Sequence, residues 1–484
     1  MTERVTRRQF ARLGAMTSAG LALGGADAWL GAQMKTAPVG APAIPEGAPP
    51  IPANAPAADF TLTTAPFELE ASPKRRIRTI AYNGQVPGPL LRMKQGRAVT
   101  IDIHNHSPNP EIVHWHGLFL PVAADGAAEE GSPMIAPGAS TRIAFTPDPA
   151  GFRWFHTHTF AGSDMHKGQY TGQHGFLMID PAFNEGSALT QGFDREIFLA
   201  LHDWDGREEP SADGSAMPVY DFSTINGKML GFGEPVRVKQ GERVMMHVLN
   251  SSPTEVHWVA LAGHRFRVLA LDGNVLHRPE TVQMLRLAPA ERVSAIVEMN
   301  APGMWVLGEV RKHIREAGMG IVVEYANAGG ELRWVQPEEL KWDYAQFALP
   351  PDYEISGGQE PPAPEIPLTF DSKFEGHGNP EIWRINGKSY PETESPVLQQ
   401  GKRYRLAMKN LSTDDHPIHL HRHTFEVTNV GGVAMRGLMK DVLLIPAGKT
   451  SAVEFTANHP GNTLFHCHQQ DHMDRGFMMV FRYA

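Results

Sequence analysis

The sequence predicts an all-β chain with three similar Greek-key β-sandwich modules in tandem. Its 484 residues exceed one ordinary core, and about 150 residues per domain suggests three domains. The 47 glycines and 39 prolines are typical of a loop-rich β protein with few helices. The same pattern of turns and strands is also written three times along the chain.

The N-terminal part of the chain has the composition of an export signal followed by a tether. Residues 6–10 (TRRQF) precede a mildly apolar stretch at 13–23, which resembles a twin-arginine signal. Asp27 and several glycines interrupt the apolar run before about 20 residues, so no stable membrane span is expected. We predict a signal peptide at 1–32, a Pro/Ala-rich linker at 33–57, and a periplasmic or otherwise exported protein handled by the twin-arginine export machinery.

Each module contains an Asn-Gly turn, a short strand, a Gln-Gly turn and an alternating strand. The Asn-Gly turns lie at Asn83, Asn226 and Asn386. Asn-Gly and Gln-Gly tolerate positive φ, and Val99-Thr100-Ile101-Asp102-Ile103 alternates as a half-buried strand does. We therefore expect modules at 58–185, 190–327 and 365–484, with a connecting segment at 328–364.

Paired histidines distinguish the first and third modules. On a strand, residues i and i+2 face the same side, so each His-x-His presents two imidazoles together. One pair means little, because imidazole suits copper, zinc, iron and nickel alike. Four pairs that recur in two copies of one module are not expected by coincidence. These pairs are His114/His116, His156/His158, His419/His421 and His466/His468.

The middle module keeps the scaffold but lacks the pairs. Where the other modules have their first pair it keeps only one histidine, His257, and Gly308 and Val310 align with the last pair of the other modules. The paired histidines are therefore expected to form a site rather than to support the fold.

The only cysteine, Cys467, cannot form a disulfide within the chain. It stands between His466 and His468, so its side chain faces the opposite side of the strand. His416 and His472 complete a two-His, one-Cys set, which is the ligand set of blue copper electron-transfer sites. Such an arrangement would connect two metal sites through adjacent residues of one strand.

From about residue 58 to the end, the chain resembles the multicopper oxidase family, in particular its three-domain laccase-like members. The motifs that carry the resemblance are HWHG, HTH, HPIHLH and HCHQQDH. It implies cupredoxin-like domains, a spacer role for the second module and four copper ions: one type 1, one type 2 and two type 3. The implied ligands are His416, Cys467 and His472 (type 1), His114 and His419 (type 2), and His116, His156, His158, His421, His466 and His468 (type 3).

Near the expected type 1 copper, the family's axial position is occupied by Phe477. Phenylalanine cannot coordinate, so we expect a non-ligating axial residue and a three-coordinate copper of raised potential. Met478 is an alternative axial residue, although neighbouring strand residues face opposite sides.

Two positions concern proton supply. Met473 stands where several family members have an acidic relay residue. Asp125 lies eleven residues past His114, where the family often has a carboxylate near the type 2 copper, and it is our candidate catalytic proton relay. The alternative is a solvated loop aspartate.

Arg422, His423, His166 and His174 are interpreted as packing or structural residues, because the ligand set is complete without them. Arg422 stands where the family more often has glycine.

We predict a laccase-like enzyme that couples one-electron oxidation of phenolic or similar substrates to four-electron reduction of dioxygen to water. Its expected partners are dioxygen and a small reductant such as a phenol, an aromatic amine or a metal ion. The net charge of -9 argues against nucleic acid, and the oligomeric state stays open.

Three alternatives remain. The first is a metallo-oxidase acting on cuprous or ferrous ion, as in copper tolerance. Residues 330–365 contain no methionine, and the only local grouping is Met435, Met439, Met473, Met478 and Met479. A copper-free structural relative should have lost its ligands, and a copper nitrite reductase has no use for eight cluster histidines.

Overall fold

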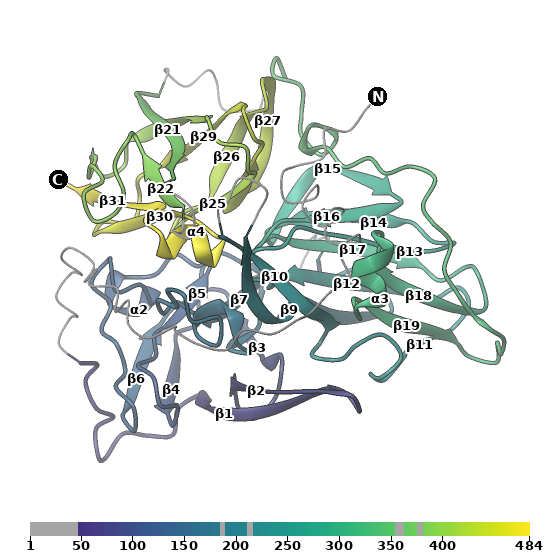
Figure 1. Cartoon of the computed structure of the whole chain (residues 1–484). Coiled ribbons are helices and arrows are strands. Elements are labelled where there is room, and N and C mark those ends of the chain that lie inside the picture. The colour runs from purple at the N-terminus through teal and green to yellow at the C-terminus, as the bar shows by residue number, and fades with distance from the viewer. Residues whose placement is uncertain (1–46, 184–188, 211–215, 354–362, 375–380) are drawn as a thin grey trace, which may run out of the picture.

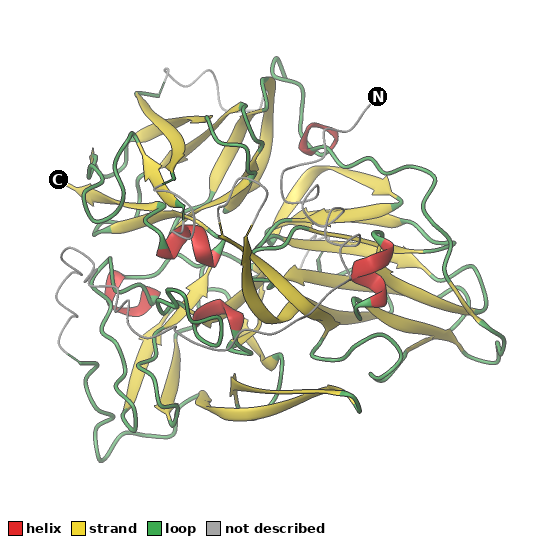
Figure 2. Cartoon of the chain, in the orientation of Figure 1, coloured by secondary structure: helices red, strands yellow, loops and turns green. Residues whose placement is uncertain are grey.

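The computed structural model describes residues 47–183, 189–210, 216–353, 363–374 and 381–484. Within them the chain is built of β-strands that form three two-sheet modules (Figures 1 and 2). The helices are single turns: α2 (Val122–Asp125), η2 (Gly168–Tyr170), α3 (Lys312–Glu316), η3 (Tyr344–Gln346) and α4 (Gln470–Asp474). The predicted all-β class of three cupredoxin-like sandwiches is confirmed. The expected signal at 1–32 lies outside the described residues.

The first module packs a sheet of order β2-β1-β4-β6 against one of order β3-β8-β7-β5. In β4 the buried residues Val99, Ile101 and Ile103 alternate with half-buried ones, as predicted. The strands are β1 (Phe60–Ser72), β2 (Arg75–Tyr82), β3 (Gly88–Lys94), β4 (Val99–Asn105), β5 (Val113–His116), β6 (Ser140–Phe145), β7 (Gly151–Thr157) and β8 (His174–Asp180).

Part of the expected tether lies against the first module. Of residues 33–57 the structure describes only 47–57. The Ala48 N–H donates to the carbonyl of Met134 at 3.0 Å. Thr141 Oγ1 donates to the carbonyl of Pro49 at 2.7 Å. These contacts attach the described end of the segment to the sandwich.

The second module has sheets of order β10-β9-β12-β17-β14-β15 and β11-β19-β18-β13-β16, with β20 beside β18. Its strands are β9 (Arg195–Pro210), β10 (Ala216–Ile225), β11 (Val236–Val238), β12 (Arg243–Asn250), β13 (His257–Leu261), β14 (Phe266–Leu271), β15 (Asn274–Val282), β16 (Met284–Leu287), β17 (Arg292–Glu298), β18 (Met304–Glu309), β19 (Gly320–Tyr325) and β20 (Leu332–Arg333).

The third module repeats this plan with sheets of order β22-β21-β24-β29-β26-β27 and β23-β31-β30-β25-β28. Its strands are β21 (Glu365–Lys373), β22 (Ile382–Ile385), β23 (Val397–Leu398), β24 (Arg403–Asn410), β25 (His416–Leu420), β26 (Phe425–Val430), β27 (Val433–Lys440), β28 (Val442–Ile445), β29 (Thr450–Thr456), β30 (Thr463–Cys467) and β31 (Met478–Tyr483).

The repeated asparagines each close a turn of their module. Asn83, Asn226 and Asn386 have φ values of 51°, 52° and 51°, in the left-handed region that asparagine tolerates. Each side chain also accepts a backbone N–H from the first strand of its module, at 2.6 Å (Thr63), 2.8 Å (Ala200) and 2.7 Å (Thr369). The turn residue therefore also ties the hairpin to its sheet.

The third module lies beside the first, with α4 and β5 close to their junction (Figure 1). The second and third modules share one hydrophobic core, to which Phe347 of the connecting segment contributes. No helix among the described residues has both the length and the apolar character needed to cross a membrane. The junction of the first and third modules holds the paired histidines.

Candidate metal centre between the first and third modules

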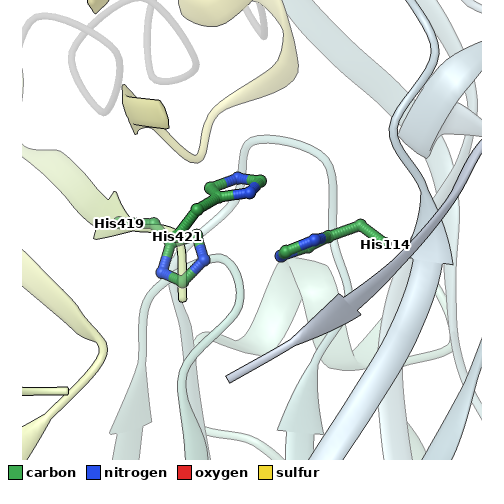
Figure 3. Close-up of side chains that lie close together, drawn as sticks. All are labelled: His114, His419 and His421. Carbon is green, nitrogen blue, oxygen red and sulfur yellow. The ribbon is translucent and has the colours of Figure 1, made fainter. Parts of the chain in front are cut away.

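Two strand pairs bring the predicted histidines together. His114 on β5 pairs with His156 on β7, and His419 on β25 pairs with His466 on β30. Each of these four histidines begins a His-x-His pair, whose second histidine lies two positions further along the chain. The rings meet across the module boundary: ring centroids are 4.0 Å apart for His114 and His421 and 3.8 Å apart for His116 and His419. Figure 3 shows His114 facing His419 and His421 from the opposite side.

The inward-facing ring nitrogens of this cluster lack hydrogen-bond partners among the described residues. They are Nε2 of His114, His156 and His419, Nδ1 of His116, and both ring nitrogens of His158 and His468. Nε2 of His421 and Nε2 of His466 face each other at 3.0 Å. A buried polar atom without a partner is costly, whereas metal ions bound in the cluster would each be ligated by one nitrogen from several of these rings.

The outer ring nitrogens are fixed by backbone carbonyls. Nδ1 of His114 lies 2.8 Å from the carbonyl oxygen of Asp125, and Nδ1 of His419 lies 2.7 Å from that of Asp441. His156 and His466 bond in the same way to the residue that follows each of them. With Nδ1–H donating, Nε2 is the free base that a metal requires.

Burial disfavours the protonated form of seven histidines of the cluster. It lowers the pKa of His419 to about 3, and the nearby imidazole of His114 adds to the effect. Burial, reinforced by neighbouring rings, also holds the pKa well below its ordinary value for His116, His156, His158, His421, His466 and His468. Neutral imidazole is the metal-binding form.

A second donor set lies on the other face of β30. Cys467 Sγ is 3.9 Å from His416 Nδ1 and 3.6 Å from His472 Nδ1, and the two nitrogens are 3.2 Å apart. All three side chains are buried. One sulfur and two imidazoles in a triangle are the donors that a blue copper site uses. The chemistry of both donor sets therefore fits copper.

Three family models described as multicopper oxidase match the chain, at residues 65–183, 196–321 and 359–484. The chain belongs to the multicopper oxidase family. It is therefore a copper-dependent oxidoreductase that uses dioxygen as its electron acceptor. Each match coincides with one of the three sandwich modules.

Curated relatives match along most of their length. The multicopper oxidase MmcO of Mycobacterium tuberculosis is 26% identical over 436 residues, covering 83% of this chain and 82% of the relative. A laccase of Phlebia radiata is 27% identical over 472 residues, covering 83% and 85%.

Solved structures share the fold. A multi-copper oxidase from Pseudomonas thermotolerans superposes with a TM-score of 0.68 at 24% identity, covering 88% of this chain and all of that one. A Campylobacter jejuni multicopper oxidase, described as a metallo-oxidase, gives 0.66 at 19%, covering 90% and 94%.

Within this multicopper oxidase, Phe477 lies against the thiolate set and Met478 does not. The Phe477 ring centroid is 4.8 Å from that of His416, and the side chain is fully buried. The Met478 side chain instead packs in a separate cluster with Leu464 and Met473. Phe477 is thus the residue that packs against this donor set, and its axial, non-ligating role stays a prediction.

Asp125 is not a solvated loop residue. It ends α2 with its side chain fully buried, so the alternative interpretation was wrong. Its Oδ2 lies 2.8 Å from Nδ1 of His421. Its carbonyl orients His114. Asp125 therefore contacts one histidine of the first module and one of the third.

Sequence reasoning missed two acidic residues beside the cluster. Asp441 Oδ1 lies 3.2 Å from Nε2 of His116. Burial acts to raise the Asp441 pKa, but the guanidinium of Arg292 outweighs it and holds the pKa at about 2. Glu130 Oε1 lies 3.7 Å from Nδ1 of His421, and burial raises its pKa well above the ordinary value. No local pattern marks either residue, because their partners are distant in sequence.

The remaining polar residues named from the sequence stay outside the cluster. Nδ1 of His423 bonds to the carbonyl of His421, and its Nε2 lies 2.8 Å from the Tyr483 hydroxyl. His174 stacks on His202, and His166 is exposed. Arg422 has φ 58°, in the left-handed region that glycine adopts without strain. All four were expected to be structural or packing residues.

The second module has a buried ion cluster where the third has its thiolate set. Val259 pairs with Glu309 just as Ile418 pairs with Cys467, so His257 and Glu309 stand at the positions of His416 and Cys467. Nε2 of His257 is 2.8 Å from Asp203 and its Nδ1 is 3.1 Å from Glu309. Charge pairing thus replaces metal donors at this position, which agrees with a spacer role.

Proposed function

We propose that the chain is a laccase-like oxidase that takes single electrons from phenolic or similar substrates near His416 or His472 and reduces dioxygen to water. The observation that carries this proposal is the placement of two donor sets on opposite faces of β30, with Cys467 between His466 and His468. Copper bound there would supply one-electron redox chemistry at the thiolate and dioxygen reduction at the imidazole cluster.

Within this proposal, His416, Cys467 and His472 hold one type 1 copper. His114 and His419 hold the type 2 copper. The type 3 pair would take His158, His421 and His466 on one ion and His116, His156 and His468 on the other. Ring nitrogens of His158, His421 and His466 lie within 4.8 Å of one another. This division gives four copper ions.

The chain itself connects the two donor sets, orients their histidines and keeps them buried. Adjacent residues of one strand link the Cys467 sulfur covalently to the imidazoles on either side. Backbone carbonyls fix the outer nitrogens of His114 and His419. Asp125, buried against His421, is positioned to pass protons toward reduced oxygen.

The placement of methionine favours a phenolic substrate over a metal ion. Met435 and Met479 are buried in the main core, and Met473 and Met478 belong to a second buried cluster. Of the grouping seen in the sequence, only Met439 is exposed. Thioethers buried as core filler offer no surface site for cuprous ion.

Steady-state rates on a phenol, on cuprous ion and on ferrous ion under air, with oxygen uptake recorded, test the substrate class. We expect the phenol to be turned over with stoichiometric oxygen uptake. Turnover of cuprous ion far faster than any phenol would instead establish the metallo-oxidase alternative.

We also propose that the protein is exported by the twin-arginine route, on the basis of Arg7 and Arg8 in their basic context. Replacing both residues by lysine should keep the enzyme in the cytoplasmic fraction. Unchanged export of that variant would refute the route.

A further inference from the structure

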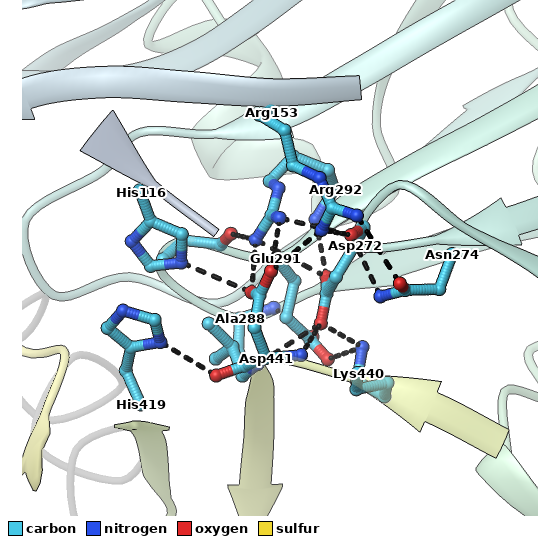
Figure 4. A network of polar contacts seen from close by, with 12 residues as sticks. His116, Arg153, Asp272, Asn274, Ala288, Glu291, Arg292, His419, Lys440 and Asp441 are labelled. Atoms are coloured by element: carbon cyan, nitrogen blue, oxygen red, sulfur yellow. Dashed lines mark hydrogen bonds and ion pairs between the residues drawn. The ribbon is translucent and has the colours of Figure 1, made fainter. Parts of the chain in front are cut away.

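A buried charged network joins all three modules beside the histidine cluster (Figure 4). Arg153 comes from the first module, Asp272 and Arg292 from the second, and Lys440 and Asp441 from the third. None of these side chains is more than 1% exposed. Burying this many charged side chains together is favourable only when each of them is paired with an opposite charge.

Arg292 is the centre of this network. Its Nη1 donates to Asp441 Oδ1 at 2.6 Å and its Nη2 donates to Oδ2 at 2.7 Å, a bidentate pair. The guanidinium also donates to the carbonyls of Ala290 and Asp272 at 3.0 and 3.1 Å. The second module therefore holds this side chain rigidly against a residue of the third.

Asp441 in turn contacts two rings of the cluster. Its Oδ1 lies 3.2 Å from Nε2 of His116, and its carbonyl lies 2.7 Å from Nδ1 of His419. Asp272 of the second module accepts from the backbone N–H groups of Asp441 and Val442 at 3.4 and 3.2 Å. The orientation of one histidine from each flanking module thus depends on contacts with the second module.

We propose that the second module, whose described residues contribute no donor, positions the trinuclear ligand set through Arg292 acting on Asp441. This inference rests on the proposed copper assignment of His116 and His419. A ligand imidazole is held in one tautomer and one orientation by the group that accepts its other N–H, and loss of such a partner typically weakens metal binding or activity by about 10- to 100-fold. Arg292 is a positioning residue, since it touches no donor atom.

The test compares Arg292→Lys with Arg311→Lys in the copper-loaded full chain. Lysine keeps the charge but loses the planar fork. Arg311 is the matched control, because it also pairs with buried carboxylate oxygens in the second module, at Glu309, away from the histidine cluster. Four measurements are made: copper per chain, the type 1 blue absorbance, the type 2 paramagnetic resonance signal, and the steady-state kinetics in dioxygen, which give kcat and KM.

We expect Arg292→Lys to keep the blue absorbance, to alter or lose the type 2 signal, and to lower kcat by about 10- to 100-fold. Asp441→Asn should show the same signature, and the double variant should be no worse than Asp441→Asn. Arg311→Lys should match the wild type in all four measurements.

A type 2 signal and a kcat that match the wild type in Arg292→Lys would overturn the inference. The inference would also be overturned if Arg292→Lys and Arg311→Lys lost the type 1 and type 2 signals to the same extent. If Arg292→Lys does not fold, Asp441→Asn decides by the same criteria. The proposed function is tested separately on the unmutated protein: substantially fewer than four coppers per chain would refute the copper assignment itself.

Discussion

Oδ2 of Asp125 lies 2.8 Å from Nδ1 of His421, although 296 positions separate the two residues. The carbonyl of the same aspartate lies 2.8 Å from Nδ1 of His114. One short helical turn of the first module therefore orients an imidazole of its own module and one of the third. The geometry of the cluster depends on how these two modules pack together.

Asp125→Asn should lower kcat by about 10- to 100-fold with little loss of copper, because an amide accepts the His421 N–H weakly and cannot release a proton. Oxygen uptake and copper content measure this. Asp102→Asn is the control, since Asp102 pairs with Arg142 on the outer sheet of the same module. A wild-type kcat in Asp125→Asn would contradict a role for this carboxylate.

Cys467→Ser should abolish the blue absorbance and turnover together while the fold survives. Serine is close in size to cysteine, but its hydroxyl stays protonated and is a poor ligand for the copper that thiolates select. The expected copper content falls by one ion, since the imidazole cluster is unaltered. Absorbance, oxygen uptake and a thermal melt check this. Retained turnover would refute the role of this strand in connecting the two sites.

Phe477→Met should lower the reduction potential of the type 1 copper, because a thioether beside His416 adds a weak axial ligand. The volume change is small, so stability should change by less than about 1.5 kcal/mol. A redox titration of the blue band measures the potential. Met478→Leu is the control and should leave the potential unchanged. An unchanged potential in Phe477→Met would place the methionine sulfur out of reach of the copper.

His257 should make the second module more stable at neutral than at alkaline pH. Burial alone would lower its pKa, but Asp203 and Glu309 outweigh burial and raise it to about 9. The folded pKa exceeds the unfolded value of about 6.5, so the stabilisation is complete below pH 6.5 and is lost as pH rises through 9. The difference corresponds to about 3 kcal/mol.

Denaturant unfolding of the wild type and of His257→Gln across this pH range measures the effect. The wild type should lose stability between pH 6.5 and 9, and His257→Gln should be less stable at pH 6.5 but nearly independent of pH over the same interval. A variant with the same pH dependence as the wild type would show that another group titrates there.

The sequence by itself determined the modules and the identity of the donors. Asn83, Asn226 and Asn386 mark turns whose backbone angles depend on the residue itself and its neighbours. The placement of Cys467 between His466 and His468 follows from the two-residue period of a strand. Both are local properties of the chain, so they can be read without knowing which segments meet.

Only the tertiary structure decided which groups surround those donors. The burial of Asp125, the contact of Asp441 with His116 and the pairing of Arg292 with Asp441 join different modules. Asp125, Arg292 and Asp441 are charged residues, which a local sequence pattern predicts to be exposed. Burying a charge is favourable only when a partner is present. The partner residue comes close only when two separate surfaces pack together. The hydrophobic periodicity of neither segment predicts this contact.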